Sequence, residues 1–465
     1  MQNILYENIS LSQNTHYFLY VGEVKALYLN EFFRESLSAM HGKDIDYIAI
    51  VPDVLQTYPE ENLLVINPAA AEQSCELGKK VSCRIPGKQF ASFVSTHPRV
   101  IELVETLAAR QGELLVNVFQ TLPEITLDRI PGVRVIGPDC RIADTWNSKF
   151  HMYRTLQGLV LLPEFRICGS RKELLQVTAE LWDHWLDGIF LTLEYSAAGA
   201  FSFLTHSEQE LLVKLGDWQP PYMISQFIPH EYDPTVLAVV ANEKDVYIGG
   251  IADQQMVRVN KFRGSVYPSA LPVDTLQGLK DLTRTVGRIM GSSGYRGIFG
   301  CDYVLDRNGN IFFVEVNARK QGTTMEMCCN LENSLPKGCP NLPELEYFAV
   351  TKNRFPDNTV ELEGNPSGIH WGTYNLKVDR EVHTCKSLGP PKHEREVFRN
   401  IASDSGNASQ HIVVEHIGAD FVVKPGTFLG RVISVAKNHQ AVYRGLDEGK
   451  KTLEETIERN LQYEI

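Results

Sequence analysis

The sequence lacks the features of membrane-spanning, secreted and disulfide-stabilised proteins. No apolar run reaches the ~18 residues that a transmembrane helix needs. The N-terminal run, MQNILYENISLSQNTHYF, has neither the basic nor the apolar region of a secretory signal. The nine cysteines form no CxxC pair, and their odd number favours reduced thiols over a disulfide framework. We therefore expect a cytoplasmic protein with no membrane partner.

Several familiar motifs and a positive surface charge are also missing. Neither GxxxxGK[ST] nor GxSxG occurs, so a P-loop enzyme and a serine hydrolase lack support. No GxGxxG follows the first predicted strand, which argues against dinucleotide binding. The 45 basic residues are outnumbered by 57 acidic ones, and a net charge of −12 argues against a broad nucleic-acid-binding surface.

The remaining features indicate a globular, mixed α/β protein of several domains. The apolar content is 43% and the charged content 22%, and 465 residues suggest about three domains. Near the N-terminus, short apolar runs alternate with helical patterns, which predicts an open, mostly parallel sheet. The predicted strands there are HYFLYVG, DYIAIVP, NLLVINP, ELLVNVF and VRVIGP. We predict domains at residues 1–140, 141–345 and 346–465.

The most informative stretch contains a predicted β-hairpin. Two β-rich runs flank Asn308-Gly309, a dipeptide typical of a two-residue type I′ turn. If this dipeptide is the loop, the register pairs Asp302 with Glu315, and Asn317 lies on the same face. Opposed carboxylates stand roughly 5 Å apart at Cβ and repel each other, which sheets normally avoid.

A divalent cation would remove this repulsion. Asp302, Glu315 and Asn317 offer the hard oxygen ligands that Mg²⁺ prefers, with water and nucleotide phosphates completing its shell. Acidic residues on a solvated strand are the alternative. The same register also puts apolar residues on the carboxylate face: Val304, Ile311 and Phe313. Charges on a largely apolar face need a reason, which favours the metal.

These residues resemble a known family. Asp302, followed after the hairpin by EVNAR at 315–319, looks like the D…ExNxR pattern with which ATP-grasp ligases hold the Mg²⁺ of MgATP. The resemblance implies an α/β ATP-grasp fold with an N-terminal pre-ATP-grasp domain and a small C-terminal α+β domain. It also implies that Arg319 contacts the transferred phosphoryl group. Arg296 would help to hold the carboxylate or the acyl phosphate, and a surface arginine is the alternative.

Two further positions follow from the resemblance. Lys149 stands where many ATP-grasp ligases carry a lysine that reaches the nucleotide phosphates, and a solvated charge is the alternative. The run GIFLTLEYSAAGAFSF would form the first strand and phosphate loop of the nucleotide lid, expected at about 150–220. Thr192 stands where a phosphate-binding lysine is expected, and Gly199 is the glycine left in the loop. The resemblance leaves Lys149, or another basic group, to compensate.

The segment YMISQFIPHEYDPTVLAVV resembles the ATP-grasp hinge that binds adenine. Gln226, Phe227 and Ile228 would recognise the adenine edge through backbone groups. Asp233 would accept the ribose hydroxyls, and Glu231 is the second candidate. A β-hairpin with a polar loop is the alternative.

Two other groups of residues fit an anion. Arg258, Lys261 and Arg263 form a basic run that suits a carboxylate or a phosphate, with a solvated loop as the alternative. Thr323 and Thr324 open a predicted helix, whose first N–H groups can bind an anion. N-capping explains these threonines equally well.

By resemblance, the chain is expected to be an ATP-dependent carboxylate–amine ligase that forms an amide or peptide bond through an acyl phosphate. Its partners would be small carboxylates and amines similar to amino acids, in specialised metabolism, as for pheganomycin-type peptide ligases. Two alternatives stay open. One is a butirosin-type ligase that loads an amino acid onto the thiol of a carrier protein, and the other is a nucleotide-binding protein without turnover. A homodimer is also left open.

Overall fold

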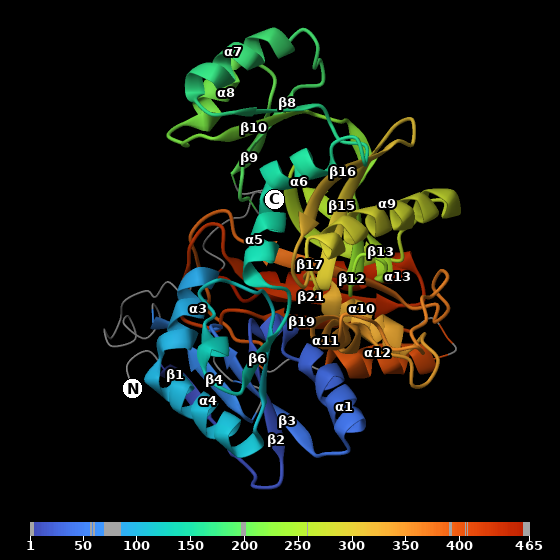
Figure 1. Cartoon of the computed structure of the whole chain (residues 1–465). Coiled ribbons are helices and arrows are strands. Elements are labelled where there is room, and N and C mark those ends of the chain that lie inside the picture. Colours follow the sequence, from blue (N-terminus) through green and yellow to red (C-terminus); the bar gives the residue numbers. More distant parts are fainter. Residues whose placement is uncertain are drawn as a thin grey trace.

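The computed structural model describes residues 4–55, 58, 61–68, 85–196, 201–257, 259–389, 393–404, 406 and 408–458. Three sheets, of six, four and nine strands, make up the architecture, with a two-stranded ribbon beside them. In Figure 1 the six-stranded sheet lies at one end of the molecule, the four-stranded sheet at the other, and the nine-stranded sheet between them. The expected α/β class is confirmed. In this part of the chain, no helix has the length and apolarity needed to cross a bilayer.

The N-terminal sheet has the strand order β1-β4-β3-β2-β5-β6, and every pair is parallel except β1 with β4. The predicted open, mostly parallel sheet is therefore confirmed. Its apolar runs are buried on both faces because α3 and α4 cover one face and α1 covers the other. The elements are β1 (Ile4–Asn8), β2 (His16–Val21), η1 (Val24–Ala26), α1 (Leu29–His41), β3 (Ile45–Val51), β4 (Leu63–Ile66), α3 (Gly87–Thr96), α4 (Pro98–Gln111), β5 (Leu114–Val118), η2 (Leu127–Arg129) and β6 (Val133–Ile136).

The four-stranded sheet is a small lid of antiparallel strands in the order β7-β10-β8-β9, with α7 and α8 packed on it. Both helices start with the S-x-x-E pattern: the hydroxyls of Ser170 and Ser207 accept hydrogen bonds from the N–H groups of Glu173 and Glu210. The elements are β7 (Phe165–Cys168), α7 (Arg171–Leu181), β8 (Ile189–Leu193), β9 (Ser202–Thr205), α8 (Glu208–Leu215) and β10 (Tyr222–Gln226).

The nine-stranded sheet has the order β11-β15-β12-β13-β14-β17-β21-β19, and β16 pairs with β15. The amphipathic helix α9 covers one face and buries Leu279, Val286 and Met290 against it. Helices α10 and α11 pack on the other face. The elements are α5 (Cys140–Asn147), α6 (Lys149–Leu156), β11 (His230–Tyr232), β12 (Pro234–Val240), β13 (Val246–Val257), β14 (Lys261–Tyr267), α9 (Val273–Ser292), β15 (Gly297–Asp306), β16 (Ile311–Asn317), α10 (Thr324–Glu332) and α11 (Leu342–Lys352).

The C-terminal strands extend this same sheet through the pairing of β14 with β17. The close approach needs a glycine, because a Cβ on Gly264 would lie 1.8 Å from the Thr373 carbonyl oxygen. The domain boundary placed near residue 345 stays a prediction, since a shared sheet joins the segments on either side of it. The elements are β17 (His370–Lys377), β18 (Val382–His383), α12 (Glu394–Ser403), β19 (Ser409–Glu415), β20 (Val422–Val423), β21 (Phe428–Ala436) and α13 (His439–Glu454).

The hairpin of β15 and β16 has the predicted carboxylate pair, although its tip differs from the prediction. Asp302 lies opposite Glu315, which confirms the pairing. The N–H of Asp306 donates to the carbonyl of Asn310, and Gly309 has a φ of +80°. The loop therefore has three residues, and the expected two-residue turn is wrong. The Asp306 side chain favours the longer loop, because it accepts hydrogen bonds from the backbone N–H of Asn308 within the loop and of Asn310 at its end.

A β-bulge corrects the register between the tip and the carboxylates. The pairing shifts between Asp302 and Tyr303, which leaves Val314 as the extra residue on β16. One extra residue inverts the alternation of faces, so Ile311 and Phe313 pack in the apolar cluster beneath α9. Their predicted place on the carboxylate face is wrong. The remaining residue of that prediction, Val304, lines the cavity described below.

Candidate active site

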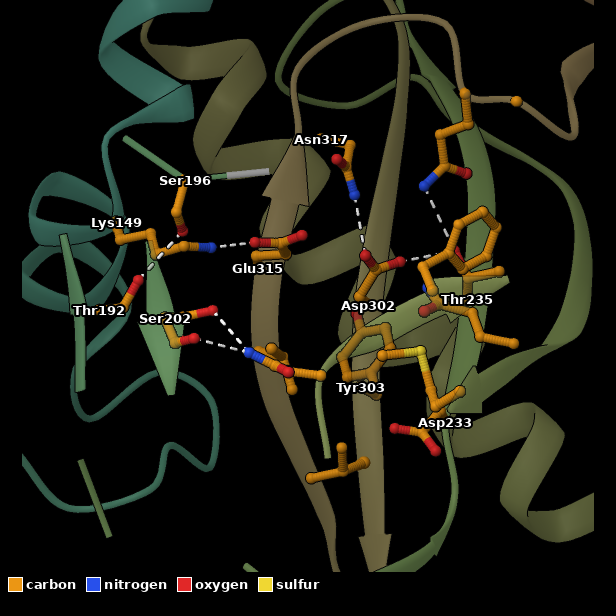
Figure 2. A pocket seen from close by; sticks show the side chains of 18 of the residues that line it. Lys149, Thr192, Ser196, Ser202, Asp233, Thr235, Asp302, Tyr303, Glu315 and Asn317 are labelled. Carbon is orange, nitrogen blue, oxygen red and sulfur yellow. Dashed lines mark hydrogen bonds and ion pairs between the residues drawn. The ribbon is translucent and has the colours of Figure 1, made fainter. Parts of the chain in front are cut away.

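A cavity of about 520 Å³ is lined by residues of the lid, the central sheet and two loops of the N-terminal sheet. Figure 2 shows side chains from the lid and from the β15–β16 hairpin facing each other across it. The cavity brings together most of the predicted site residues that the structure describes. They are Lys149, Gln226, Phe227, Ile228, Asp233, Asp302, Glu315, Asn317 and Arg319.

The central wall of the cavity holds a chain of hydrogen bonds around Asp302 (Figure 2). Its carboxylate accepts from Thr235 Oγ1 at 2.7 Å and from Asn317 Nδ2 at 2.9 Å. Arg319 Nη1 in turn donates to Asn317 Oδ1 at 2.8 Å. The D…ExNxR residues are therefore one connected unit, because β-pairing puts Asp302 beside Glu315 and the end of β16 places the other two.

Two carboxylates in this wall oppose each other electrostatically. Burial, with a further contribution from the charge of Glu315, raises the pKa of Asp302 to about 6. Hydrogen bonds from Thr235 and Asn317 work against this rise. A divalent cation would relieve both the burial cost and the repulsion. The donor set of two carboxylates and one amide fits Mg²⁺, which binds through one or two carboxylates and substrate phosphates.

Lys149 reaches the same carboxylates from the side of the lid. It is the first residue of α6, and Ser148 caps that helix by accepting from the N–H of His151. Ser148 Oγ also donates to Glu194 Oε1 at 2.6 Å, which ties the helix start to the chain that follows β8. The Lys149 ammonium forms an ion pair with Glu315 and is nearly buried. A solvated surface lysine is thereby excluded.

The lid offers neutral groups to the cavity where the resemblance predicts a lysine. Thr192 Oγ1 lies 3.0 Å from Ser196 Oγ. Ser202, on β9, accepts from Asn260 Nδ2 through its carbonyl oxygen at 2.8 Å and its hydroxyl at 3.0 Å. These contacts link the lid to the turn after β13 (Figure 2). Gly199 lies outside the described residues.

The predicted adenine hinge lines the cavity at the junction of the lid and the central sheet. The N–H groups of Gln226 and Phe227 donate to the carbonyls of Glu164 and Gly188. Neither of these two N–H groups is therefore available to a ligand. The N–H of Ile228 donates to none of the described residues, so it is the hinge N–H that a ligand can use.

Asp233, the candidate ribose acceptor, also lines the cavity, whereas Glu231 does not. Its carboxylate lies 3.0 Å from His230 Nε2. Burial alone would lower the pKa of His230, but Asp233 and the carbonyl of Ile228 raise it overall. Asp233 is thus held at the cavity wall by a histidine.

The two predicted catalytic arginines have different positions. Arg319 lines the cavity, but Arg296 does not, and it donates to the backbone carbonyls of Gly291 and Tyr295. Arg296 precedes β15 by one residue, so it stands six residues from Asp302 along an extended chain, roughly 20 Å. The expectation that it holds the acyl phosphate has no support in this position.

Of the other predicted anion-binding residues, some line the cavity and others do not. Arg258 lies outside the described residues, and Arg263 donates to the carbonyl of Lys377 at 2.9 Å rather than lining the cavity. Thr323 lines the cavity at the start of α10 and makes no side-chain capping bond there. Thr324 instead accepts from the N–H of Gln321 at 3.0 Å.

The sequence analysis missed the part of the cavity that the N-terminal domain supplies. Glu23 and Lys25 follow β2, whereas Phe119 and Gln120 follow β5. The two loops meet because β2 and β5 are neighbours in the sheet. The available signal was positional: ligands of open α/β sheets bind outside the carboxyl ends of the strands.

No family model matches the chain. Over 279 residues it is 22% identical to the L-glutamate ligase of the butirosin acyl-carrier protein from Niallia circulans. The match covers 58% of this chain and 64% of that ligase, so the chain spans less than two thirds of the length of this curated relative.

Several solved structures share the fold over nearly the whole chain. The carboxyaminoimidazole ribonucleotide synthase from Aspergillus clavatus, complexed with ATP, has a TM-score of 0.56 at 14% identity, covering 96% of this chain and all of that one. The Campylobacter jejuni biotin carboxylase has a TM-score of 0.60 at 13% identity, covering 95% and 91%. The L-amino acid ligase from Bacillus licheniformis has a TM-score of 0.58 at 12% identity, covering 96% and 98%. With its lid, its hinge and its paired carboxylates, the chain has the ATP-grasp fold that these solved structures share.

Proposed function

We propose that the protein is an ATP-dependent ligase that activates a carboxylate with the γ-phosphoryl group of ATP and joins the acyl group to an amine. One observation carries the proposal. Asp302 and Glu315 face each other in the wall of a cavity of about 520 Å³, with Lys149 and Arg319 beside them. This arrangement of charge suits the phosphates of a nucleotide and a metal ion, because it offers both cations and hard oxygen ligands.

The nucleotide would enter with its base at the hinge. The N–H of Ile228, which donates to none of the described residues, would bind the adenine edge, and Asp233 would accept a ribose hydroxyl. The phosphates would then extend toward Lys149, whose ammonium is held in the cavity by Glu315. The resemblance supports the same order of contacts.

Asp302, Glu315 and Asn317 would hold Mg²⁺, which when bound neutralises charge on the transferred phosphoryl group. The chain's own contribution is positional. Arg319, oriented by Asn317, places a guanidinium where negative charge develops on the phosphoryl oxygens. Loose phosphoryl-transfer transition states need mainly such positioning and charge compensation.

The proposed reaction has two steps. A carboxylate oxygen of the substrate attacks the γ-phosphorus, the bond from that phosphorus to the β,γ-bridging oxygen breaks, and ADP leaves. The amine lone pair then attacks the acyl carbon of the acyl phosphate, inorganic phosphate leaves, and the amine loses a proton. The products are ADP, phosphate and an amide. We propose that the substrates are small molecules similar to amino acids. We also propose that the enzyme acts in specialised metabolism and in the cytoplasm.

The test is direct. Purified protein is incubated with MgATP and pooled L-amino acids, nucleotides are separated to score ADP against AMP, and products are identified by mass. ADP together with a new amide supports the proposal. AMP as the nucleotide product, or no ADP above the level of a Glu315→Gln control, overturns it.

A second candidate is favoured by the similarity to the L-glutamate ligase of the butirosin acyl-carrier protein. In this version the nucleophile in the second step is the thiol of a carrier protein, and the product is a thioester. An assay with and without a carrier protein distinguishes the amine reaction from the thiol reaction. If ADP release and acyl transfer require an added carrier protein bearing a phosphopantetheine thiol, the thiol version holds, and amide formation without a carrier protein excludes it.

A further inference from the structure

The end of the cavity near the N-terminal sheet contains a charged pair that the proposed nucleotide site does not use. Glu23 and Lys25 lie in the loop after β2, and Phe119 lies in the loop after β5. The chain passes from β2 to β3 on one side of β2, while β5 pairs on its other side. The strand order therefore reverses between β2 and β5, where open α/β sheets bind their ligands.

The loop that carries the pair is held rigidly. A Cβ on Gly22 would lie 2.3 Å from Tyr20 Oη and 2.8 Å from Phe119 Cβ, so the close passage of this loop requires glycine. The N–H of Val24 donates to Asp53 Oδ2 at 2.9 Å, which anchors the short helical turn to the loop after β3. A rigid turn holds charged groups in place before a ligand arrives.

The pair itself faces the cavity and stays accessible. Glu23 Oε2 and Lys25 Nζ are 2.5 Å apart, and 45% of the Glu23 side chain and 20% of the Lys25 side chain are exposed. Lys25 Nζ also lies 5.2 Å from the centroid of the Phe119 ring, a cation–π distance. The ammonium of Lys25 thus has a second partner when Glu23 binds another cation.

Glu23 remains ionised at neutral pH. Burial alone would raise its pKa, but Lys25 and, more weakly, His416 and Arg319 lower it overall. Glu23 and Arg319, the arginine proposed for phosphoryl transfer, line the same cavity. The cavity lining therefore includes the negative group of Glu23 together with the positive groups of Lys25 and Arg319.

We infer that Glu23 binds the ammonium group of the substrate whose carboxylate is activated, and that this substrate is an α-amino acid. Its carboxylate then points toward Arg319 and the start of α10 at Thr323, which also line the cavity. In the absence of substrate, the ammonium of Lys25 pairs with the carboxylate of Glu23. The inference rests on the proposed function, because it names the acyl donor of that reaction.

The experiment compares amino acids with their analogues that lack the amino group. The probe pairs are L-phenylalanine with 3-phenylpropionate, L-alanine with propionate, and L-glutamate with glutarate. Binding is measured by calorimetry on protein saturated with MgADP, and ADP formation is measured separately with MgATP. The variants are Glu23→Gln and, as a matched control, Glu102→Gln, which removes a carboxylate from the surface ion pair with Arg99.

At least one amino acid should bind the wild type tighter than its analogue, by about tenfold to a hundredfold, since an ammonium–carboxylate contact is a charged hydrogen bond. Glu23→Gln should remove this preference by weakening the amino acid alone, with MgADP affinity unchanged, and Glu102→Gln should keep it. Equal affinity within every pair, no amino acid binding, or equal weakening of both members in Glu23→Gln overturns the inference. Amino acid binding without ADP formation sustains the inference and refutes the proposed ligase. ADP formation with equal affinity for amino acids and their analogues supports the proposed ligase and overturns the inference.

Discussion

The two walls of the cavity differ in how they present polar groups to a nucleotide. The wall of the central sheet is charged: it carries Asp302 and Glu315 on paired strands. The lid wall is neutral where the resemblance predicts a lysine, with Thr192 and Ser196 in mutual contact. Most of the charged groups that could contact a nucleotide therefore lie on the nine-stranded sheet.

Lys149 connects the two walls and explains how the lid can be neutral. It starts a helix that is bound to the lid strand β8 through Glu194, yet its ammonium pairs with Glu315 of the central sheet. Lys149 therefore makes contacts with both walls of the cavity. Charged groups whose positions are fixed by a hydrogen-bonded sheet are pre-organised for a ligand.

The largest effect should come from the central wall. Glu315→Gln should lower ADP production by about two orders of magnitude or more, because one metal ligand and its charge are lost. Circular dichroism should show an unchanged fold, and Asp302→Asn should behave similarly. The matched control is Glu363→Gln, which alters an exposed glutamate that pairs with Lys280 at the surface. Turnover at the wild-type rate in Glu315→Gln would refute the metal role and end the contrast between the walls.

The lysine between the walls should rank second. Lys149→Met should weaken ATP binding by about tenfold or more, because a charge-assisted contact to the phosphates is lost. Isothermal titration with ATP and Mg²⁺ measures the change. Lys172→Met serves as the control, since Lys172 lies on the exposed side of α7 in the lid. An unaltered ATP dissociation constant in Lys149→Met would show that another cation compensates for the neutral lid.

The neutral lid should contribute less than either charged group. Thr192→Val removes the hydroxyl that contacts Ser196 and keeps the shape of the side chain, so ATP binding should weaken by only about threefold to tenfold. Thr178→Val is the control for lid stability, because Thr178 is buried in α7 and bonds to the carbonyl of Leu175. If Thr192→Val weakens ATP binding as much as Lys149→Met does, the two walls contribute equally to phosphate binding.

The hinge between the walls should show the smallest effect, and it depends on pH. The pKa of His230 is raised above its ordinary value of 6.5 by Asp233, against burial that would lower it. Stabilisation by the His230–Asp233 pair is therefore fully present below pH 6.5 and is lost as the pH rises through the raised value. His230→Gln should lower the unfolding free energy by under about 1 kcal/mol at pH 5.5 and by less at pH 8.5. Thermal unfolding across this range measures it, and a larger loss at pH 8.5 contradicts the assignment.

Local strand pairing explains why the central wall could be predicted. The pairing of Asp302 with Glu315 depends on residues close together in the chain, and the sequence pattern contains it. The prediction reached this pair through two errors that cancel: the loop has one residue more than expected, and the bulge at Val314 restores the register. The same bulge moved Phe313 to the opposite face, because the alternation of strand faces has a period of two.

Contacts between distant segments could not be predicted in the same way. Arg296 is close to the hairpin in sequence, but its Nε donates at 3.1 Å to Oδ1 of Asn353, a residue 57 positions further along the chain. Glu23 lies far from the hairpin in sequence, yet it lines the same cavity as Arg319. Nothing in local periodicity encodes which strand of the N-terminal sheet stands beside β2.

Apolar periodicity and short-range strand pairing in the sequence predict the α/β class, the mostly parallel N-terminal sheet and the paired hairpin carboxylates, whereas the lysine at the start of α6 is predicted by the family resemblance alone. The tertiary structure alone decided that the loops after β2 and β5 meet the hairpin in one cavity, and that Lys149 reaches Glu315. Those contacts depend on strand order and on the packing of three sheets, which bring together residues that no local pattern relates.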